Sequence, residues 1–77
     1  MDTKSPTFGE KAVGLTFNPS GDNAVNEVKA SFARAIDLMN ELRENCHSPE
    51  QERMYSIAIT DAQAAQMWAV KAITWRD

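Results

Sequence analysis

Apolar residues recur at helical spacing over the first long stretch of the chain. From residue 22 to residue 46 they fall every three or four positions, which places them on one face of an α-helix. No glycine or proline interrupts this spacing before the end of the stretch. The apolar face consists of Val25, Val28, Phe32, Ala35, Ile36, Met39 and Leu42, and the opposite face of Lys29, Arg34, Asp37, Glu41 and Glu44. The pattern predicts a helix over residues 22–46 with one packed and one solvated face.

A second helix is predicted over residues 49–75. Ser48 is a favourable N-cap residue, and Pro49 suits the first helical position. Gln51 follows the serine by three residues, as in a capping box. Because the link between the two stretches is short, we expect the two helices to run antiparallel as a hairpin.

The second stretch is apolar on more than one side. Alanines recur in steps of four and three residues, and Asp61 is the only charged residue between Met54 and Val70. The alanines are Ala58, Ala62, Ala65, Ala69 and Ala72, and the larger apolar residues are Ile57, Ile59, Met67, Trp68, Val70 and Ile73. Helix propensity alone is one explanation of the alanines. The other is close packing, and a hairpin can cover only one side. We therefore expect a symmetric homo-oligomer.

Residues 1–21 contain all three glycines and two of the three prolines. This composition predicts an irregular arm with at most a short helix. The arm also carries Phe8, Val13, Leu15 and Phe17, which are costly to leave in water, so we expect it to pack. The predicted fold is one all-α domain over residues 1–77, with an arm at 1–21 and helices at 22–46 and 49–75.

Composition narrows the function. A chain of 77 residues is marginally stable alone, and a single cysteine, Cys46, leaves no disulfide within the chain. The lone histidine, His47, adjoins that cysteine, and neighbouring residues seldom bind one metal ion, so no metal site is predicted. A net charge of −3 argues against DNA or long RNA as a partner. No signal-peptide pattern or membrane segment is present, which favours a cytoplasmic protein.

The chemistry-bearing residues suggest binding and not catalysis. Adjacent Cys46 and His47 are poorly placed to act as nucleophile and base, and no glycine-rich phosphate loop occurs, so neither an enzyme nor a cofactor is predicted. Phe17 and Lys29 supply an aromatic ring and a cation near a helix start, where they could stack a base and neutralise a phosphate. The alternative is a hydrophobic staple and a surface lysine.

Arg53, Ser56 and Thr60 follow one another at spacings of three and four residues and therefore share a face of the second helix. They could bind a second anionic group. The alternative is a surface ion pair of the arginine with a nearby glutamate, next to two hydroxyls that bond their own backbone.

The segments FNPSGDNAVNEVK and SPEQERMYSIAITDAQAAQMWAVKAITW, from Phe17 to Trp75, resemble the phage-encoded anti-CBASS sponge family. The resemblance implies a helical hairpin that forms a homohexamer in the bacterial host cytoplasm. It also implies that the protein binds cyclic dinucleotides such as 3′,3′-cyclic GMP-AMP without turnover. Some members of the family bind cyclic trinucleotides at separate pockets, and the resemblance extends this expectation to the present chain. The rival hypothesis is a helical interaction or inhibitor protein that has no small ligand.

The resemblance also implies roles for particular residues. Phe17 and Lys29, with Asn18 and Ser20, correspond to the cyclic dinucleotide site. Arg53 and Thr60, with Ser56, correspond to the cyclic trinucleotide site. Phe17 stands where the family's stacking residue is tyrosine, so stacking is kept and any hydroxyl hydrogen bond is lost.

Overall fold

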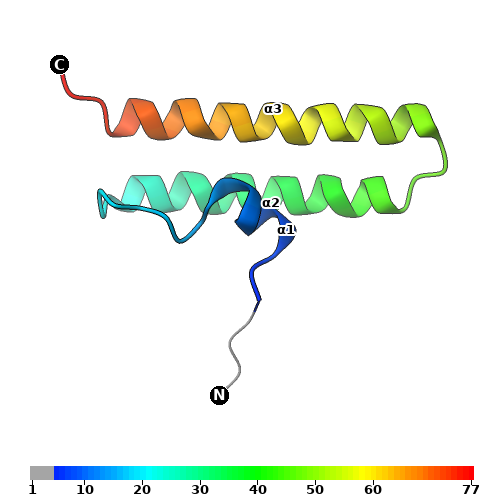
Figure 1. The fold of residues 1–77 in the computed structure, drawn as a ribbon, viewed down its shortest axis with the longest axis horizontal. Helices are drawn as coiled ribbons and strands as arrows, with labels where there is room; N and C mark the ends of the chain where they lie inside the picture. Colours follow the sequence, from blue (N-terminus) through cyan, green and yellow to red (C-terminus); the bar gives the residue numbers. More distant parts are fainter. Residues whose placement is uncertain (1–4) are drawn as a thin grey trace.

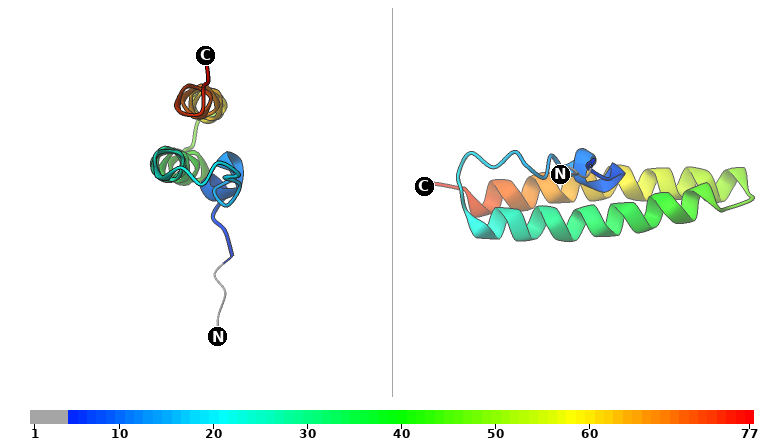
Figure 2. Two further views of the ribbon diagram at one scale, coloured as in Figure 1. Left: turned by 90° about the vertical axis from the view of Figure 1, so that its left-hand side faces the viewer. Right: turned by 90° about the horizontal axis from the view of Figure 1, so that it is seen from below.

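The computed structural model describes residues 5–77, and this part of the chain is all-helical. Its helices are α1 (Phe8–Val13), α2 (Asn23–Glu44) and α3 (Pro49–Ile73). The two long helices run antiparallel and side by side, and α1 lies against α2 on another side (Figures 1 and 2). The shortest dimension of the molecule is 12 Å. α1 and α2 lie side by side across this dimension, and α3 lies at the edge of the molecule beside α2 (Figure 2). Most of the surface of α3 therefore lies away from the rest of the chain.

The ends of the helices follow from local capping. Asp22 begins α2 by accepting a hydrogen bond from the Ala24 amide at 2.8 Å, and the Asn45 side chain donates to the Glu41 carbonyl at its end. Ser48 begins α3 by accepting from the Gln51 amide at 3.3 Å. Both long helices end two residues before the positions 46 and 75 that the apolar pattern indicated.

The predicted capping box of α3 is wrong in one respect. Within residues 5–77, the Gln51 side chain makes no return bond to the Ser48 amide, so the cap is one-sided. The arm contains the complete box instead. Thr7 accepts from the Glu10 amide at 3.0 Å, and the Glu10 carboxylate accepts from the Thr7 amide at 2.9 Å. This reciprocal pair stabilises a helix that is otherwise too short to persist.

The core lies where α1, α2 and α3 meet. Val13, Ala33, Ile36 and Ile59 are buried there, and Phe32, Met39 and Ala62 pack around them. α1 contacts α2 with the backbone of Gly9, which has no side chain to separate the two helices. A Cβ atom on Gly9 would lie 2.9 Å from the Ala33 carbonyl carbon and closer still to its oxygen. The Gly9 amide donates to the Asp37 carboxylate at 2.6 Å. The arm therefore packs on its own subunit, and glycine is required at the point of contact.

The solvated face predicted for the first long helix is partly wrong. Lys29 is only 5% exposed, and Asp37 is exposed only in part because α1 lies over it. The arm covers this side of α2 and supplies hydrogen-bond partners to both residues. Leu42, assigned to the packed face, is 43% exposed, so this assignment is also wrong.

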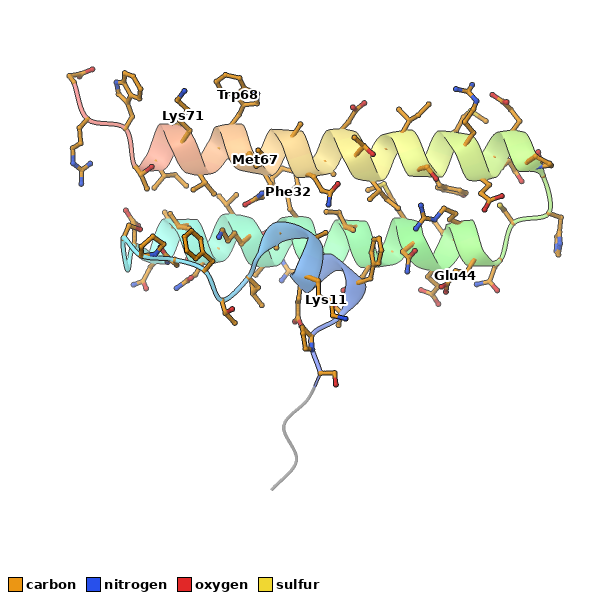
Figure 3. All side chains as sticks on the ribbon, viewed as in Figure 1. Lys11, Phe32, Glu44, Met67, Trp68 and Lys71 are labelled. Carbon is orange, nitrogen blue, oxygen red and sulfur yellow. The ribbon has the colours of Figure 1, made fainter. Side chains whose placement is uncertain are left out.

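The predicted alanine seam lies along the edge where α3 meets α2. Ala58, Ala62 and Ala69 are half-buried, whereas Ala65 and Ala72 are exposed. Trp68 and Lys71 point away from α2 (Figure 3). α3 is thus buried on one side and carries exposed apolar side chains on the other. In the described residues, no helix is long and apolar enough to cross a membrane.

Candidate functional site

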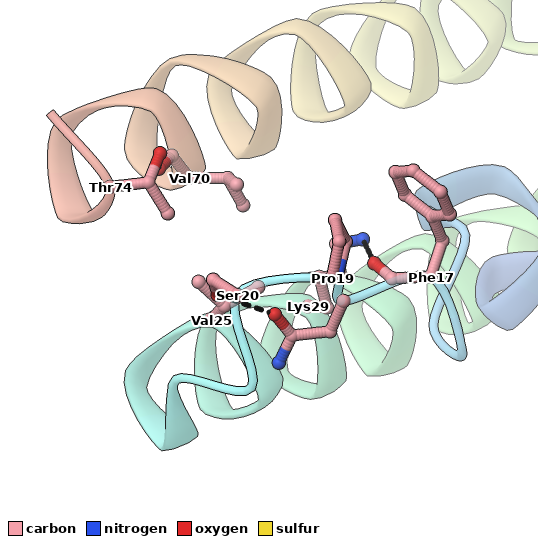
Figure 4. A pocket seen from close by; sticks show the side chains of 8 residues that line it. Phe17, Pro19, Ser20, Val25, Lys29, Val70 and Thr74 are labelled. Carbon is pink, nitrogen blue, oxygen red and sulfur yellow. Dashed lines mark hydrogen bonds between the residues drawn. The ribbon is translucent and has the colours of Figure 1, made fainter.

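A pocket of about 250 Å³ lies at the end of the hairpin where α2 begins and α3 ends (Figure 4). Its walls come from three segments that are far apart in the sequence: the loop after α1, the first turns of α2 and the last turn of α3. Its lining residues are Phe17, Asn18, Pro19, Ser20, Val25, Lys29, Val70 and Thr74. The structure therefore brings together the four residues that were assigned to the dinucleotide site.

Lys29 is a buried cation that is held by backbone carbonyls. Its Nζ donates to the Gly14 carbonyl oxygen at 2.9 Å and also to the Phe17 carbonyl oxygen. No carboxylate in residues 5–77 lies within ion-pair distance of it. An ammonium group has three N–H donors, so one donor is left over and the positive charge is not neutralised. Such a group is well suited to bind a phosphate oxygen.

Backbone geometry explains why the two carbonyls meet the lysine. Gly14 ends α1 in the left-handed conformation, with a φ of 62°. This conformation turns the chain back toward α2, as glycine commonly does at the end of a helix. The Phe17 amide donates to the Gly14 carbonyl at 2.9 Å and closes a tight turn. Both carbonyl oxygens then face Lys29, and this turn fixes the position of the ammonium.

The Phe17 ring stands at the mouth of the pocket. Its centroid lies 5.5 Å from Lys29 Nζ, and the residue is 71% exposed. A large apolar ring left in solvent beside a cation offers a free face on which a nucleobase can stack. The hydrophobic-staple alternative requires a buried ring, and this exposure argues against it.

Asn18 and Ser20 shape the loop and leave little capacity for a ligand. The Asn18 amide group donates to the Asp22 carbonyl at 3.0 Å and to the Asn26 side chain at 2.9 Å. The Ser20 hydroxyl donates to the Asn18 side chain at 2.7 Å. These bonds hold the loop across the start of α2 and thereby set the position of the adjacent Phe17.

The three residues assigned to the trinucleotide site are not gathered into a pocket of one chain. Arg53 bonds Glu50, with its Nη2 2.5 Å from the carboxylate, and both side chains are largely exposed. This hydrogen bond raises the pKa of Arg53. Ser56 faces α2 instead, where it accepts from Arg43 at 3.0 Å. Thr60 is exposed.

The loop between α2 and α3 contains Cys46 and His47. The Cys46 thiol donates to the Arg43 carbonyl at 3.1 Å, and no hydrogen bond joins it to His47 in residues 5–77. The same range contains no group of three or more histidine, cysteine or acidic side chains arranged to hold a metal ion.

Sequence reasoning missed the wall of the pocket that α3 provides. Val70 and Thr74 line it, and the Thr74 hydroxyl is occupied by a hydrogen bond to the Val70 carbonyl at 2.9 Å. A signal was available: in an antiparallel hairpin, the last turn of the second helix must lie beside the first turn of the first helix.

Comparison with known proteins identifies a family model that matches the chain. The sequence model described as "Acb2/Tad1, hairpin domain" matches residues 10–74, which is most of the chain. No curated protein and no solved structure matches the chain significantly. The matched range includes α2, α3 and the whole pocket. The chain therefore belongs to the Acb2/Tad1 hairpin-domain family, the sponges that counter CBASS defence by binding cyclic nucleotides.

Proposed function

We propose that the chain sequesters cyclic dinucleotide messengers, such as 3′,3′-cyclic GMP-AMP, in the host bacterial cytoplasm and so blocks CBASS signalling. The observation that carries this proposal is the buried, unneutralised Lys29 ammonium beside the exposed Phe17 ring. The lysine binds a phosphate and the ring stacks a base. Family membership supports a binding protein, and no group in the pocket would cleave a phosphodiester.

The size of the pocket supports a site that is shared by two chains. Its volume of about 250 Å³ suits one nucleotide of a cyclic dinucleotide. Pockets that enclose a whole drug-sized ligand are usually larger than this. Two copies related by a two-fold axis would supply two Phe17 rings for the two bases and two Lys29 ammoniums for the two phosphates. One ligand per two chains follows, and this arrangement explains how a chain of net charge −3 binds a dianion.

A cyclic trinucleotide would bind where three chains meet, and a hexamer has axes of both kinds. Arg53 is the residue that would contact the phosphates there, with Thr60 beside it. Arginine suits this role because its planar group donates hydrogen bonds in pairs. Ser56 contributes less, because it already accepts from Arg43 on its own chain. The exposed Arg53–Glu50 pair must open for this ligand to bind.

Calorimetric titration with 3′,3′-cyclic GMP-AMP tests the proposed function. We expect saturation near one ligand per two chains and intact nucleotide after release by heating. The decisive variant is Phe17→Ala, which removes the ring and keeps the carbonyl that Lys29 binds. Loss of base stacking costs about 1–3 kcal/mol per base, so affinity should fall at least about ten-fold.

Phe8→Ala is the matched control, because it removes a second exposed ring of the arm that lies outside the pocket. It should bind the ligand as the unchanged protein does. Equal binding by the Phe17→Ala and Phe8→Ala variants would refute the assigned site. No binding of any cyclic di- or trinucleotide would favour the alternative of a helical interaction protein, for which the exposed apolar face of α3 is the supporting observation.

A further inference from the structure

The outer face of α3 carries a stripe of six residues that α2 does not cover. They follow one another in steps of four and three, so they lie on one side of the helix and of the turn that follows it: Ile57, Asp61, Ala64, Trp68, Lys71 and Trp75. Trp68 is 69% exposed, Trp75 59% and Ile57 45%. Asp61 and Lys71 are the only charged residues of the stripe. An exposed apolar surface of this extent is uncommon on a chain that remains monomeric.

We propose that a second copy of the chain covers this face, with the two α3 helices antiparallel about a two-fold axis near position 66. The axis is fixed by three pairs of residues. Position 66 is the midpoint of Asp61 and Lys71, of Ala64 and Trp68, and of Ile57 and Trp75. A two-fold axis at this point places each residue opposite its complement on the second copy. The stripe is therefore complementary to itself.

Each of the three pairs makes a physically favourable contact. Ala64 leaves space for the indole ring of Trp68 of the second copy, which is the small-against-large packing that close helices need. Ile57 packs on the ring of Trp75 of the second copy. Asp61 attracts Lys71 of the second copy. Each of these charges therefore has an opposite charge beside it when the apolar stripe becomes buried in the contact.

Charge also fixes the direction of pairing. A parallel pair in register would place Asp61 on Asp61 and Lys71 on Lys71, which is repulsive. Within one chain these two residues lie about 15 Å apart along the helix, so they cannot pair with each other. The Lys71 ammonium lies 5.2 Å from the Trp68 ring and 5.9 Å from the Trp75 ring. Its flexible stem can carry it from these rings to a carboxylate on the second copy.

This contact differs from the one that shares the ligand. The pocket is lined by Val70 and Thr74 on the side of α3 that faces α2, whereas the stripe lies on the side that faces away (Figures 3 and 4). The α3 contact adds a second interface to the assembly described under the proposed function. It rests on the proposed function only for the expectation that the chain self-associates. Two different two-fold contacts on one chain are sufficient to build a closed dihedral assembly.

Charge reversal tests the pairing on the full chain. We expect Asp61→Lys and Lys71→Asp each to weaken self-association about ten-fold or more in sedimentation velocity, because each places like charges opposite one another. The double variant Asp61→Lys/Lys71→Asp should regain association. A mixture of the two single variants should also regain it, because the mixed pair matches both charges. The mixture shows that the contact joins different copies. Loss of association in each single variant and its recovery in the double variant are specific to antiparallel pairing, because a parallel pair in register places like charges opposite one another in the unchanged chain and in all three variants.

Glu41→Lys is the matched control, since it makes the same change in charge sign at an exposed position of α2 and should leave the particle mass unchanged. Circular dichroism of every variant checks that the helices are intact. Single variants with the mass of the unchanged protein would overturn the proposal, as would a mixture that stays dissociated. A different protein bound in fixed ratio over this face would also overturn it. Ligand titration of the unchanged chain reports separately on the proposed function.

Discussion

At the scale of single residues, Lys29 is the least expected feature of the chain. Burying an ammonium without a counter-ion is costly, and two carbonyl oxygens offset only part of that cost. The remaining N–H donor and the unneutralised charge gain most from an anion that enters the pocket. The same residue joins the arm to α2, so occupation of the pocket and the order of the Gly14–Phe17 turn are linked through one side chain.

Arg53 presents the opposite case, because its charge is already paired. The Glu50 carboxylate occupies the guanidinium group, and the same bond raises the pKa of Arg53. We predict that Glu50→Gln strengthens the binding of a cyclic trinucleotide about two- to five-fold, because it frees the arginine and removes a repelling charge. Calorimetry with cyclic tri-AMP measures the change.

Glu52→Gln is the control for this prediction, since it removes a charge from the same helical turn without breaking a bond to Arg53. If Glu50→Gln and Glu52→Gln shift the affinity equally, general electrostatics explains the effect. Weaker binding by Glu50→Gln would instead mean that the glutamate orients the arginine for the ligand.

At the scale of elements, the docking of α1 depends on a glycine. A methyl group at position 9 would overlap the Ala33 carbonyl, and backbone cannot move aside as a flexible side chain can. We predict that Gly9→Ala destabilises the fold by about 1–3 kcal/mol. In a chain of this size the melting temperature then falls by roughly 4–24 °C, as measured by circular dichroism at a fixed protein concentration.

Gly21→Ala serves as the comparison. A Cβ atom at position 21 would meet no atom within 4 Å apart from its chain neighbours, so the positive φ of 68° is the only obstacle to a side chain there. Its cost is conformational, about 1–2 kcal/mol, and it should leave α1 docked. The two variants should therefore differ in the near-ultraviolet signal of the arm. If Gly9→Ala keeps the native signal and melting temperature, the close approach of α1 to α2 is wrong.

The helices could be predicted from sequence because their signals are local. Periodicity placed the two long helices, and Ser48 with Pro49 marked the start of α3. The buried and exposed faces of the helices were harder to predict, because the exposure of a face depends on which other segments pack against it. Lys29 and Asp37 were predicted to be solvated, and only the structure shows that the arm covers them. The sequence predicted only those pocket residues that lie in the loop after α1 and in α2. Val70 and Thr74 were not predicted, because they reach the pocket only through the antiparallel arrangement of α2 and α3.

At the scale of the whole molecule, the hairpin is a thin layer with its core on one side of α3. A chain of 77 residues with four buried side chains in its core cluster has little stability of its own. Much of the apolar surface of α3 is still exposed in one chain, so association should contribute a large share of the stability. The pocket at one end and the stripe along the outer face would then both be completed by neighbouring copies.

Folding, association and ligand binding should therefore be thermodynamically coupled, and the melting temperature should report on all three. We predict that the melting temperature rises with protein concentration, because dilution separates copies that stabilise one another. Adding 3′,3′-cyclic GMP-AMP at about 100 times its Kd should stabilise the liganded pair by about 2.7 kcal/mol, and the dependence on protein concentration should weaken. Scanning calorimetry over a range of protein concentrations, with and without nucleotide, measures both effects. A melting temperature that is independent of concentration would mean that the single hairpin is stable alone, and the exposed face of α3 would then need another explanation.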